Sequence, residues 1–176
     1  MLWTVVGILV ALAIVGVGVV VLVGRALPVD HEATCAVRLN QPAQAVWGVI
    51  TGINELPTWR PGLKKVELLP SDDGTVRWRE FDRHGNIAYE ITEADPPKRL
   101  ITRITDTGLP FGGTWTWTLE PQADGTTSVS VTENGQVYNI LFRVISRFVI
   151  GHTATMRKNL TALAAHFGES ATIDGA

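Results

Sequence analysis

The 176-residue sequence has one cysteine, few histidines and no surplus of positive charge. The single cysteine, Cys35, excludes an internal disulfide framework and a cysteine-based zinc site. With 15 Lys and Arg against 17 Asp and Glu, the net charge is −2, so no basic surplus is available to neutralise nucleic-acid phosphates. We therefore expect no nucleic-acid partner.

The sequence also lacks the common catalytic and cofactor motifs. There is no Gly-x-Ser-x-Gly nucleophile elbow and no Gly-x-Gly-x-x-Gly dinucleotide fingerprint. The four histidines show neither His-x-His nor His-Glu-x-x-His spacing. We therefore expect no metal and no cofactor.

Charge is absent from one long stretch. Residues Leu2 to Gly24 are 18 hydrophobic residues, four glycines and Thr4. At about 1.5 Å per residue, a helix of this length spans the hydrocarbon core of a bilayer. A cleaved signal peptide is the alternative, but the apolar run is too long for one and Gly24–Pro28 is a poor cleavage site. The sequence thus predicts a transmembrane anchor over residues 1–24.

The residues after the anchor predict how the remaining chain sits at the membrane. Arg25 is the only Lys or Arg close to the end of the run, and the positive-inside rule then places the following domain in the cytoplasm. The linker 25–33 reaches about 30 Å even when fully extended. We expect a cell-membrane protein whose domain stays close to the bilayer.

The soluble part, 34–168, has strand and helix patterns in a fixed order. A half-buried strand (34–40) is followed by a helix opening at Pro42 and a short helix around 54–62. Six strand-like runs separated by turn signals predict an antiparallel meander: 63–69, 75–83, 87–93, 100–105, 114–120 and 127–133. Apolar residues at helical spacing then predict one long helix over 138–167, with a bend at Gly151, and a flexible tail at 169–176. This order indicates an α+β domain with a curved sheet of about seven strands.

Several short motifs resemble those of the START-like or SRPBCC superfamily, the helix-grip fold. They are PAQAVW (42–47), LPTWRP (56–61), DPPKRL (95–100), GTWTW (113–117) and TENG (132–135). Within the superfamily, the sequence is most similar to the bacterial polyketide cyclase/dehydrase and lipid-transport group. The resemblance implies a cavity between the sheet and the long helix that holds a hydrophobic small molecule or lipid. It does not imply a reaction, because fold does not determine function.

Bulky side chains on alternating strand positions are candidates for the cavity lining. Trp115 and Trp117 alternate with threonines, so one strand face is large and apolar. Plain core packing is the alternative, since aromatic residues fill cores as readily as they line pockets. The other apolar candidates are Trp47, Trp59, Trp78, Phe148 and Met156.

Three polar residues are candidates for the polar end of such a cavity. Glu133 continues the inward alternation of its strand, where a lone carboxylate is costly unless paired. His152 lies on the apolar stripe of the long helix and is the expected partner, either as a ligand-orienting pair or as acid and base. Glu80 shares a strand face with Trp78 and is a further candidate. A satisfied core histidine is the alternative for His152.

Two segments are candidates for access to the cavity and to the membrane. Leu109 and Phe111 lie in a glycine-containing loop that could gate the entrance. Arg60, next to Trp59, is expected to be a solvated surface charge. The very apolar stretch Tyr138–Ile150 is either a helix start packed under the sheet edge or an interfacial segment on the bilayer.

These observations favour a membrane-anchored carrier or sensor that binds a hydrophobic small molecule or lipid. The first alternative is a cyclase/dehydrase-like enzyme that uses Glu133 and His152 as acid and base. The second is a non-catalytic interaction domain whose core is filled. The sequence leaves catalysis open, leaning against it, and leaves the oligomeric state open.

Overall fold

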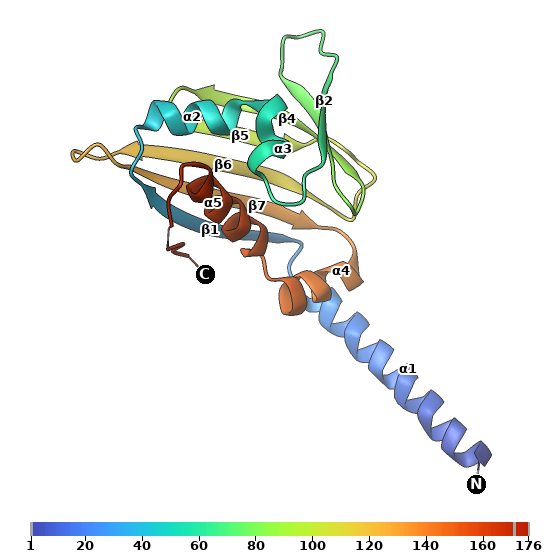
Figure 1. Ribbon diagram of the computed structural model, residues 1–176. Coiled ribbons are helices and arrows are strands. Elements are labelled where there is room, and N and C mark those ends of the chain that lie inside the picture. The colour runs from blue at the N-terminus through green and yellow to red at the C-terminus, as the bar shows by residue number, and fades with distance from the viewer. Residues whose placement is uncertain (1, 171, 176) are drawn as a thin grey trace.

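The computed structural model describes residues 2–170 and 172–175 as one long helix followed by an α+β domain (Figure 1). The strands are β1 (Asp30–Leu39), β2 (Lys65–Leu69), β3 (Arg77–Phe81), β4 (Asn86–Asp95), β5 (Arg99–Ile104), β6 (Phe111–Pro121) and β7 (Thr127–Val137). The helices are α1 (Leu2–Ala26), α2 (Ala43–Thr51), η1 (Ile53–Glu55), α3 (Leu56–Trp59), α4 (Ile140–Ile145), the π-helical η2 (Ser146–Ile150) and α5 (Ala154–His166).

The seven strands form one antiparallel sheet in the order β1-β7-β6-β5-β4-β3-β2. Strands β2 to β7 follow one another as a meander, and β1 pairs with β7 from Asp30↔Gln136 to Leu39↔Thr127. The helices α2, α3 and α5 cover one face of the sheet (Figure 1). The predicted α+β helix-grip fold is confirmed, including the two short helices after the first strand.

The core lies between the sheet and these helices. Alternate residues of β1, β6 and β7, among them Val37, Leu119 and Val131, point into it and are almost fully buried. Met156 and Leu160 of α5 pack against them at helical spacing. Inward-facing residues recur every two positions along the strands and every three to four positions along α5. The apolar residues of α5 therefore determine which face of this helix packs on the sheet.

The long helix expected over residues 138–167 is divided into α4, η2 and α5. Gly151 has a φ of 78°, in the left-handed region that glycine adopts without steric cost, and it ends η2. The π-helical turn also shifts the helical phase of the residues before it. The apolar stripe is therefore discontinuous, and of these three segments only α5 lies over the face of the sheet.

The ends of the domain are more ordered than the sequence indicates. Strand β1 begins at Asp30 rather than residue 34, which leaves only residues 27–29 between α1 and the sheet. In the tail, expected to be flexible, Asp174 exchanges two backbone hydrogen bonds of 2.9 Å with Ala36. The tail thereby pairs with β1, the strand at one edge of the sheet.

Helix α1 is long and apolar enough to cross a membrane, and it is held against the domain at its carboxyl end. Gly24 lies so close to Ile140 of α4 that a Cβ atom would fall 2.5 Å from the Ile140 carbonyl oxygen. The guanidinium group of Arg143 donates to the carbonyl oxygens of Gly24 (3.2 Å), Leu27 (3.4 Å) and Val137 (2.7 Å). One arginine therefore joins α1, its connection to β1 and the end of β7.

Candidate functional site

A cavity of about 350 Å³ lies between the sheet and the short helices. Its floor is formed by β3 to β7, and its other walls by α2, α3, the segment 60–63 and α5. This volume falls within the range of small-molecule pockets, which is about 300–1,000 Å³. The space predicted from the resemblance is therefore present.

Aromatic rings form much of the cavity wall. Trp115 and Trp117 of β6 both face it, as their alternation with threonine predicts. Trp78 of β3 stacks on Tyr89 of β4 with ring centroids 5.6 Å apart. Burial raises the pKa of the Tyr89 hydroxyl, and the Glu80 carboxylate adds to the effect. Tyr89 therefore contributes a neutral phenol to the cavity wall.

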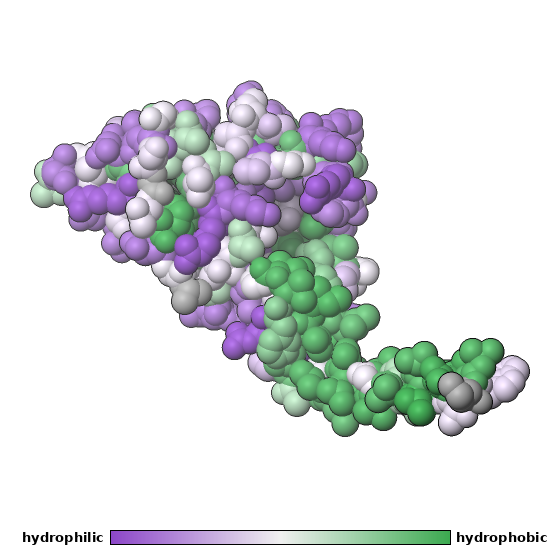
Figure 2. All heavy atoms as spheres, turned by 60° about the horizontal axis from the view of Figure 1, so that its bottom comes forward, coloured by the Kyte–Doolittle hydropathy of each residue, from purple (hydrophilic) through white to green (hydrophobic). Residues whose placement is uncertain are grey.

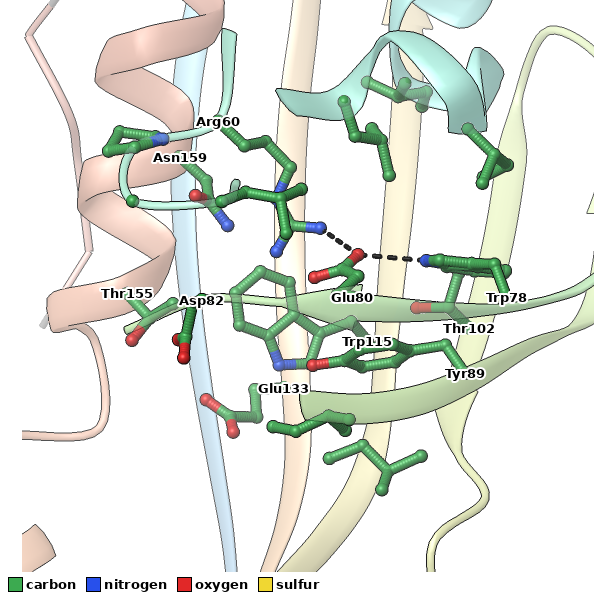
Figure 3. Close-up of a pocket in the computed structure, with 18 of the residues that line it drawn as sticks. Arg60, Trp78, Glu80, Asp82, Tyr89, Thr102, Trp115, Glu133, Thr155 and Asn159 are labelled. Atoms are coloured by element: carbon green, nitrogen blue, oxygen red, sulfur yellow. Dashed lines mark hydrogen bonds and ion pairs between the residues drawn. The ribbon is translucent and has the colours of Figure 1, made fainter. Parts of the chain in front are cut away.

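A buried ion pair lies among these rings. Glu80 of β3 accepts hydrogen bonds from Arg60 Nη1 (2.5 Å) and from Trp78 Nε1 (3.0 Å). The side chains of Arg60 and Glu80 are only 21% and 10% exposed, so the expectation of a solvated Arg60 is wrong. The backbone of Arg60 turns to extended geometry at the end of α3, next to Pro61, and its side chain enters the cavity (Figure 3).

A second carboxyl group, Glu133, faces the cavity from β7. It lies opposite Trp115 in the β6–β7 register, and the two side chains are close in Figure 3. Burial raises the pKa of Glu133, and hydrogen bonding by Trp115 opposes part of that rise. Glu133 is therefore poised to hold a proton at a higher pH than an exposed glutamate.

The histidine beside Glu133 is His31 of β1. His31 Nε2 lies 3.9 Å from Glu133 Oε1, and its ring stacks on that of His152 with centroids 3.8 Å apart. Gly135 makes room for the ring, because a Cβ there would lie 2.2 Å from it. Burial is the largest cause lowering the pKa of both histidines. His31 thus contacts both members of the expected Glu133–His152 pair.

The predicted site residues, taken together, divide into two groups. The cavity brings together Trp59, Trp78, Glu80, Phe111, Trp115, Trp117 and Glu133. The other five lie outside its lining: Trp47 and Met156 are buried in the core, His152 stacks on His31, Leu109 is in the loop before β6, and Phe148 is 65% exposed. Phe148 is displaced because it belongs to the π-helical turn before the break at Gly151.

Several cavity residues carry no signal that sequence reasoning used. Tyr89 has alternating neighbours typical of any half-buried strand, and Asn159 is one polar residue among the apolar positions of α5. His31, which lies outside the cavity lining but next to Glu133, is in a segment expected to be linker. Over residues 2–170 and 172–175, no group of three His, Cys, Asp or Glu side chains is arranged to hold a metal ion.

Comparison with known families now accounts for this architecture. The model of the family described as "Polyketide cyclase / dehydrase and lipid transport" matches residues 30–168. The chain belongs to this family. The match covers β1 through α5, so it includes every wall of the cavity, and it confirms the SRPBCC-like resemblance. A search of curated proteins finds no match.

Solved structures of the same fold come from several bacteria. A conserved protein from Geobacillus kaustophilus aligns with a TM-score of 0.66 and 17% identity over 81% of this chain and 99% of its own. The Zhui aromatase/cyclase from a Streptomyces species aligns with a TM-score of 0.61 and 16% identity over 78% of this chain and 93% of its own. The XoxI protein from Bacillus cereus aligns with a TM-score of 0.62 and 16% identity over 77% and 94%. At these identities the likeness concerns the fold.

Proposed function

We propose that this family member is a membrane-anchored carrier or sensor of a hydrophobic small molecule or lipid. The observation that carries the proposal is the cavity of about 350 Å³ lined by Trp59, Trp78, Trp115 and Trp117. Burial of apolar ligand surface in the cavity contributes roughly 25 cal/mol of favourable binding free energy per Å². The entropic and desolvation costs of association are subtracted from this gain. The open volume favours binding over the alternative of a filled core.

The surface next to α1 supports action at a bilayer. Figure 2 shows the hydrophobic atoms of α1 continuing onto the adjoining surface of the domain. Leu141, Phe148, Val149 and Ile150 of α4 and η2 are exposed there, and α4 contacts α1. An apolar surface adjoining a candidate membrane span favours the interfacial alternative for residues 138–150.

The position of Arg25 favours a cytoplasmic domain. In this proposal the apolar run 1–24 is the anchor, the expected linker is reduced to residues 27–29, and the domain that begins with β1 at Asp30 binds the ligand. The hydrogen bonds of Arg143 to Gly24 and Leu27 support this proposal, because they join the end of α1 to the domain.

The proposed gate segment connects the membrane-facing surface with the cavity. Phe111 lines the cavity and stacks on Phe142 of α4, with ring centroids 5.6 Å apart. Leu109 lies two residues earlier, in the loop before β6. Displacement of this segment would open the cavity beside α4, and a ligand dissolved in the bilayer could enter there.

Binding is tested by identifying the compounds that remain bound to the purified full-length protein. Protein purified in detergent is extracted with organic solvent, and apolar compounds are quantified by mass spectrometry. The proposal predicts about one apolar compound per chain, and loss of that compound in Thr102→Phe, which fills the cavity from β5. Equal amounts of the same compound in both proteins would contradict it.

A second candidate function is an acid–base reaction of the cyclase/dehydrase type. The observation that favours it is Glu133, a cavity carboxyl group with a raised pKa and His31 3.9 Å away. In this scheme Glu133 holds or accepts the proton, and His31 with His152 takes the place of the expected single histidine. Glu133→Gln would then abolish turnover while the protein still retains its ligand. Unchanged turnover in this variant would rule out the scheme.

A further inference from the structure

Two nitrogen donors in the cavity wall have no acceptor. Trp59 Nε1 and Asn159 Nδ2 are the buried side-chain nitrogen or oxygen atoms without a hydrogen-bond partner among residues 2–170 and 172–175. Trp59 is 9% exposed and Asn159 is 4% exposed. Both residues line the cavity, one from α3 and the other from α5.

These two donors come from elements that lie together. Helices α3 and α5 contact each other, and Figure 3 shows Asn159 on the same side of the cavity as Arg60, the residue after Trp59. A buried N–H group that has lost water without gaining an acceptor costs about 1–3 kcal/mol. Both nitrogen atoms are enclosed by neighbouring groups, so an acceptor oxygen that displaces one of these groups from the cavity wall would be stabilised there.

The acceptors nearby do not serve these donors. The Glu80 carboxylate already accepts from Arg60 and Trp78, and Asp82 accepts from the backbone N–H groups of His84 and Gly85. A ligand oxygen can satisfy Trp59 and Asn159 without disturbing these hydrogen bonds.

The charges around the cavity indicate a neutral oxygen. The positive charge of Arg60 is balanced by Glu80, while Glu133 and Asp82 supply two further acidic groups and no second cation lines the described cavity. A carboxylate or phosphate in this space would meet repulsion without compensation. A ketone, ester or amide oxygen accepts hydrogen bonds without bringing charge.

We propose that Trp59 and Asn159 select an apolar ligand carrying a neutral carbonyl oxygen, which both residues bind within the cavity. This rests on the proposed binding function and narrows it to one ligand chemistry. The volume of about 350 Å³ accommodates roughly a dozen groups at about 30 Å³ each, so the ligand is of medium size.

The test compares probes that differ in this oxygen. Full-length protein in lipid nanodiscs is exposed to equal amounts of 2-dodecanone, dodecane and dodecanoate, and native mass spectrometry measures what is bound, with empty nanodiscs correcting for partition into lipid. We expect the ketone to exceed both the alkane and the carboxylate. The preference over the alkane should be about two- to tenfold for each donor.

Two variants remove one donor each while keeping an apolar side chain. Trp59→Phe and Asn159→Leu are each expected to lower the ketone-to-alkane ratio by about two- to tenfold and to leave dodecane binding in place. Trp47→Phe is the matched control, because Trp47 is a buried tryptophan outside the cavity lining and its loss should not change the ratio. With a ¹³C-labelled carbonyl, the bound resonance should move downfield in the wild type and less so in each variant.

The outcomes separate this inference from the function on which it rests. Binding of dodecane and 2-dodecanone in equal amounts, or stronger binding of dodecanoate, would overturn the inference and keep the binding function. An unchanged ketone-to-alkane ratio in both donor variants would also overturn it. Binding of none of the three probes would overturn the binding function itself.

Discussion

At the residue scale, the cavity depends on polar groups whose charges are balanced by specific neighbours. The strand alternation places Trp78, Glu80, Trp115, Trp117 and Glu133 on the inward face, and all five line the cavity. It does not reveal which cation neutralises Glu80, because Arg60 lies 20 residues away along the chain. The identity of such partners follows from packing of α3 over the sheet, which no local pattern contains.

Breaking the Arg60–Glu80 ion pair from the Arg60 side should destabilise the protein. Arg60→Met keeps the side-chain stem and leaves a largely buried carboxylate without its cation, which should cost about 2 kcal/mol of unfolding free energy. Denaturant unfolding in detergent, followed by tryptophan fluorescence, measures it.

The control for this variant is Lys65→Met. Lys65 also bonds a glutamate, Glu67, but both side chains are well exposed, and such pairs contribute at most about 1 kcal/mol. Equal losses for Arg60→Met and Lys65→Met would show that the buried pair has no special role.

The stacked histidines predict loss of stability in mild acid. Burial lowers the pKa of His31 and of His152, so the unfolded chain binds protons at about pH 6.5 while the folded chain resists them. Nearby charges shift the two pKa values in opposite directions. Asp30 raises the pKa of His31, whereas Arg147 lowers the pKa of His152. The contribution of this histidine pair to the free energy of unfolding should therefore fall as the pH drops below about 6.5.

Replacing one imidazole tests this pH dependence. His152→Gln should lose less stability than the wild type between about pH 7.5 and about pH 5.5, measured by thermal unfolding. Exposed His84→Gln is the control and should follow the wild type. The raised pKa of Glu133 works in the opposite direction in both proteins, so the comparison isolates the histidines. A His152→Gln curve parallel to the wild type would contradict the account.

At the element scale, the contact between α1 and α4 determines how the domain sits beside α1. The sequence shows the apolar run and the apolar stretch 138–150 separately, and nothing in their patterns indicates that they touch. Contact requires the small residue Gly24 opposite Ile140 and the reach of Arg143 to the carbonyl oxygens at the end of α1. The break at Gly151 was only partly predictable, because a glycine marks a possible bend but not a π-helical turn.

A side chain at position 24 should separate these two helices. Gly24→Val places a Cβ within 2.5 Å of the Ile140 carbonyl oxygen, where backbone must move. Hydrogen exchange of the α4 amides should become about tenfold faster or more, since the packing of α4 against α1 is lost. Gly7→Val is the matched control, because a Cβ there meets no atom within 4 Å. Slow exchange retained in Gly24→Val would contradict the role of this contact.

At the scale of the whole molecule, apolar residues are concentrated in two separate regions. The hydrophobic atoms of α1 face outward along its length, whereas those of the domain surround a cavity. The fold could be predicted from the sequence because strand alternation, turn residues and helix spacing all agree. The polar side of the cavity could not, because it combines residues from α3, β3, β7 and α5 that meet only in the folded chain.

The exposed apolar surface of η2 should hold the domain at the bilayer. Phe148 and Val149 are 65% and 77% exposed, so a charge at either position is tolerated by the fold but disfavoured in lipid. Phe148→Glu should leave thermal stability within about 0.5 kcal/mol of the wild type and make η2 more accessible to a water-soluble spin label in nanodiscs. Exposed Lys64→Glu, outside this surface, is the control. Identical accessibility of η2 in both variants would contradict contact with the membrane.

The central claim is that the tryptophan-lined cavity receives an apolar molecule. Contact quenching by 1-bromododecane tests it most directly in the full-length protein in nanodiscs, with Trp3→Phe as the background so that no tryptophan lies in α1. We predict saturable quenching of the cavity tryptophans, and its loss when Thr102→Phe fills the cavity. Quenching that never saturates, or that is the same with and without Thr102→Phe, would contradict the account.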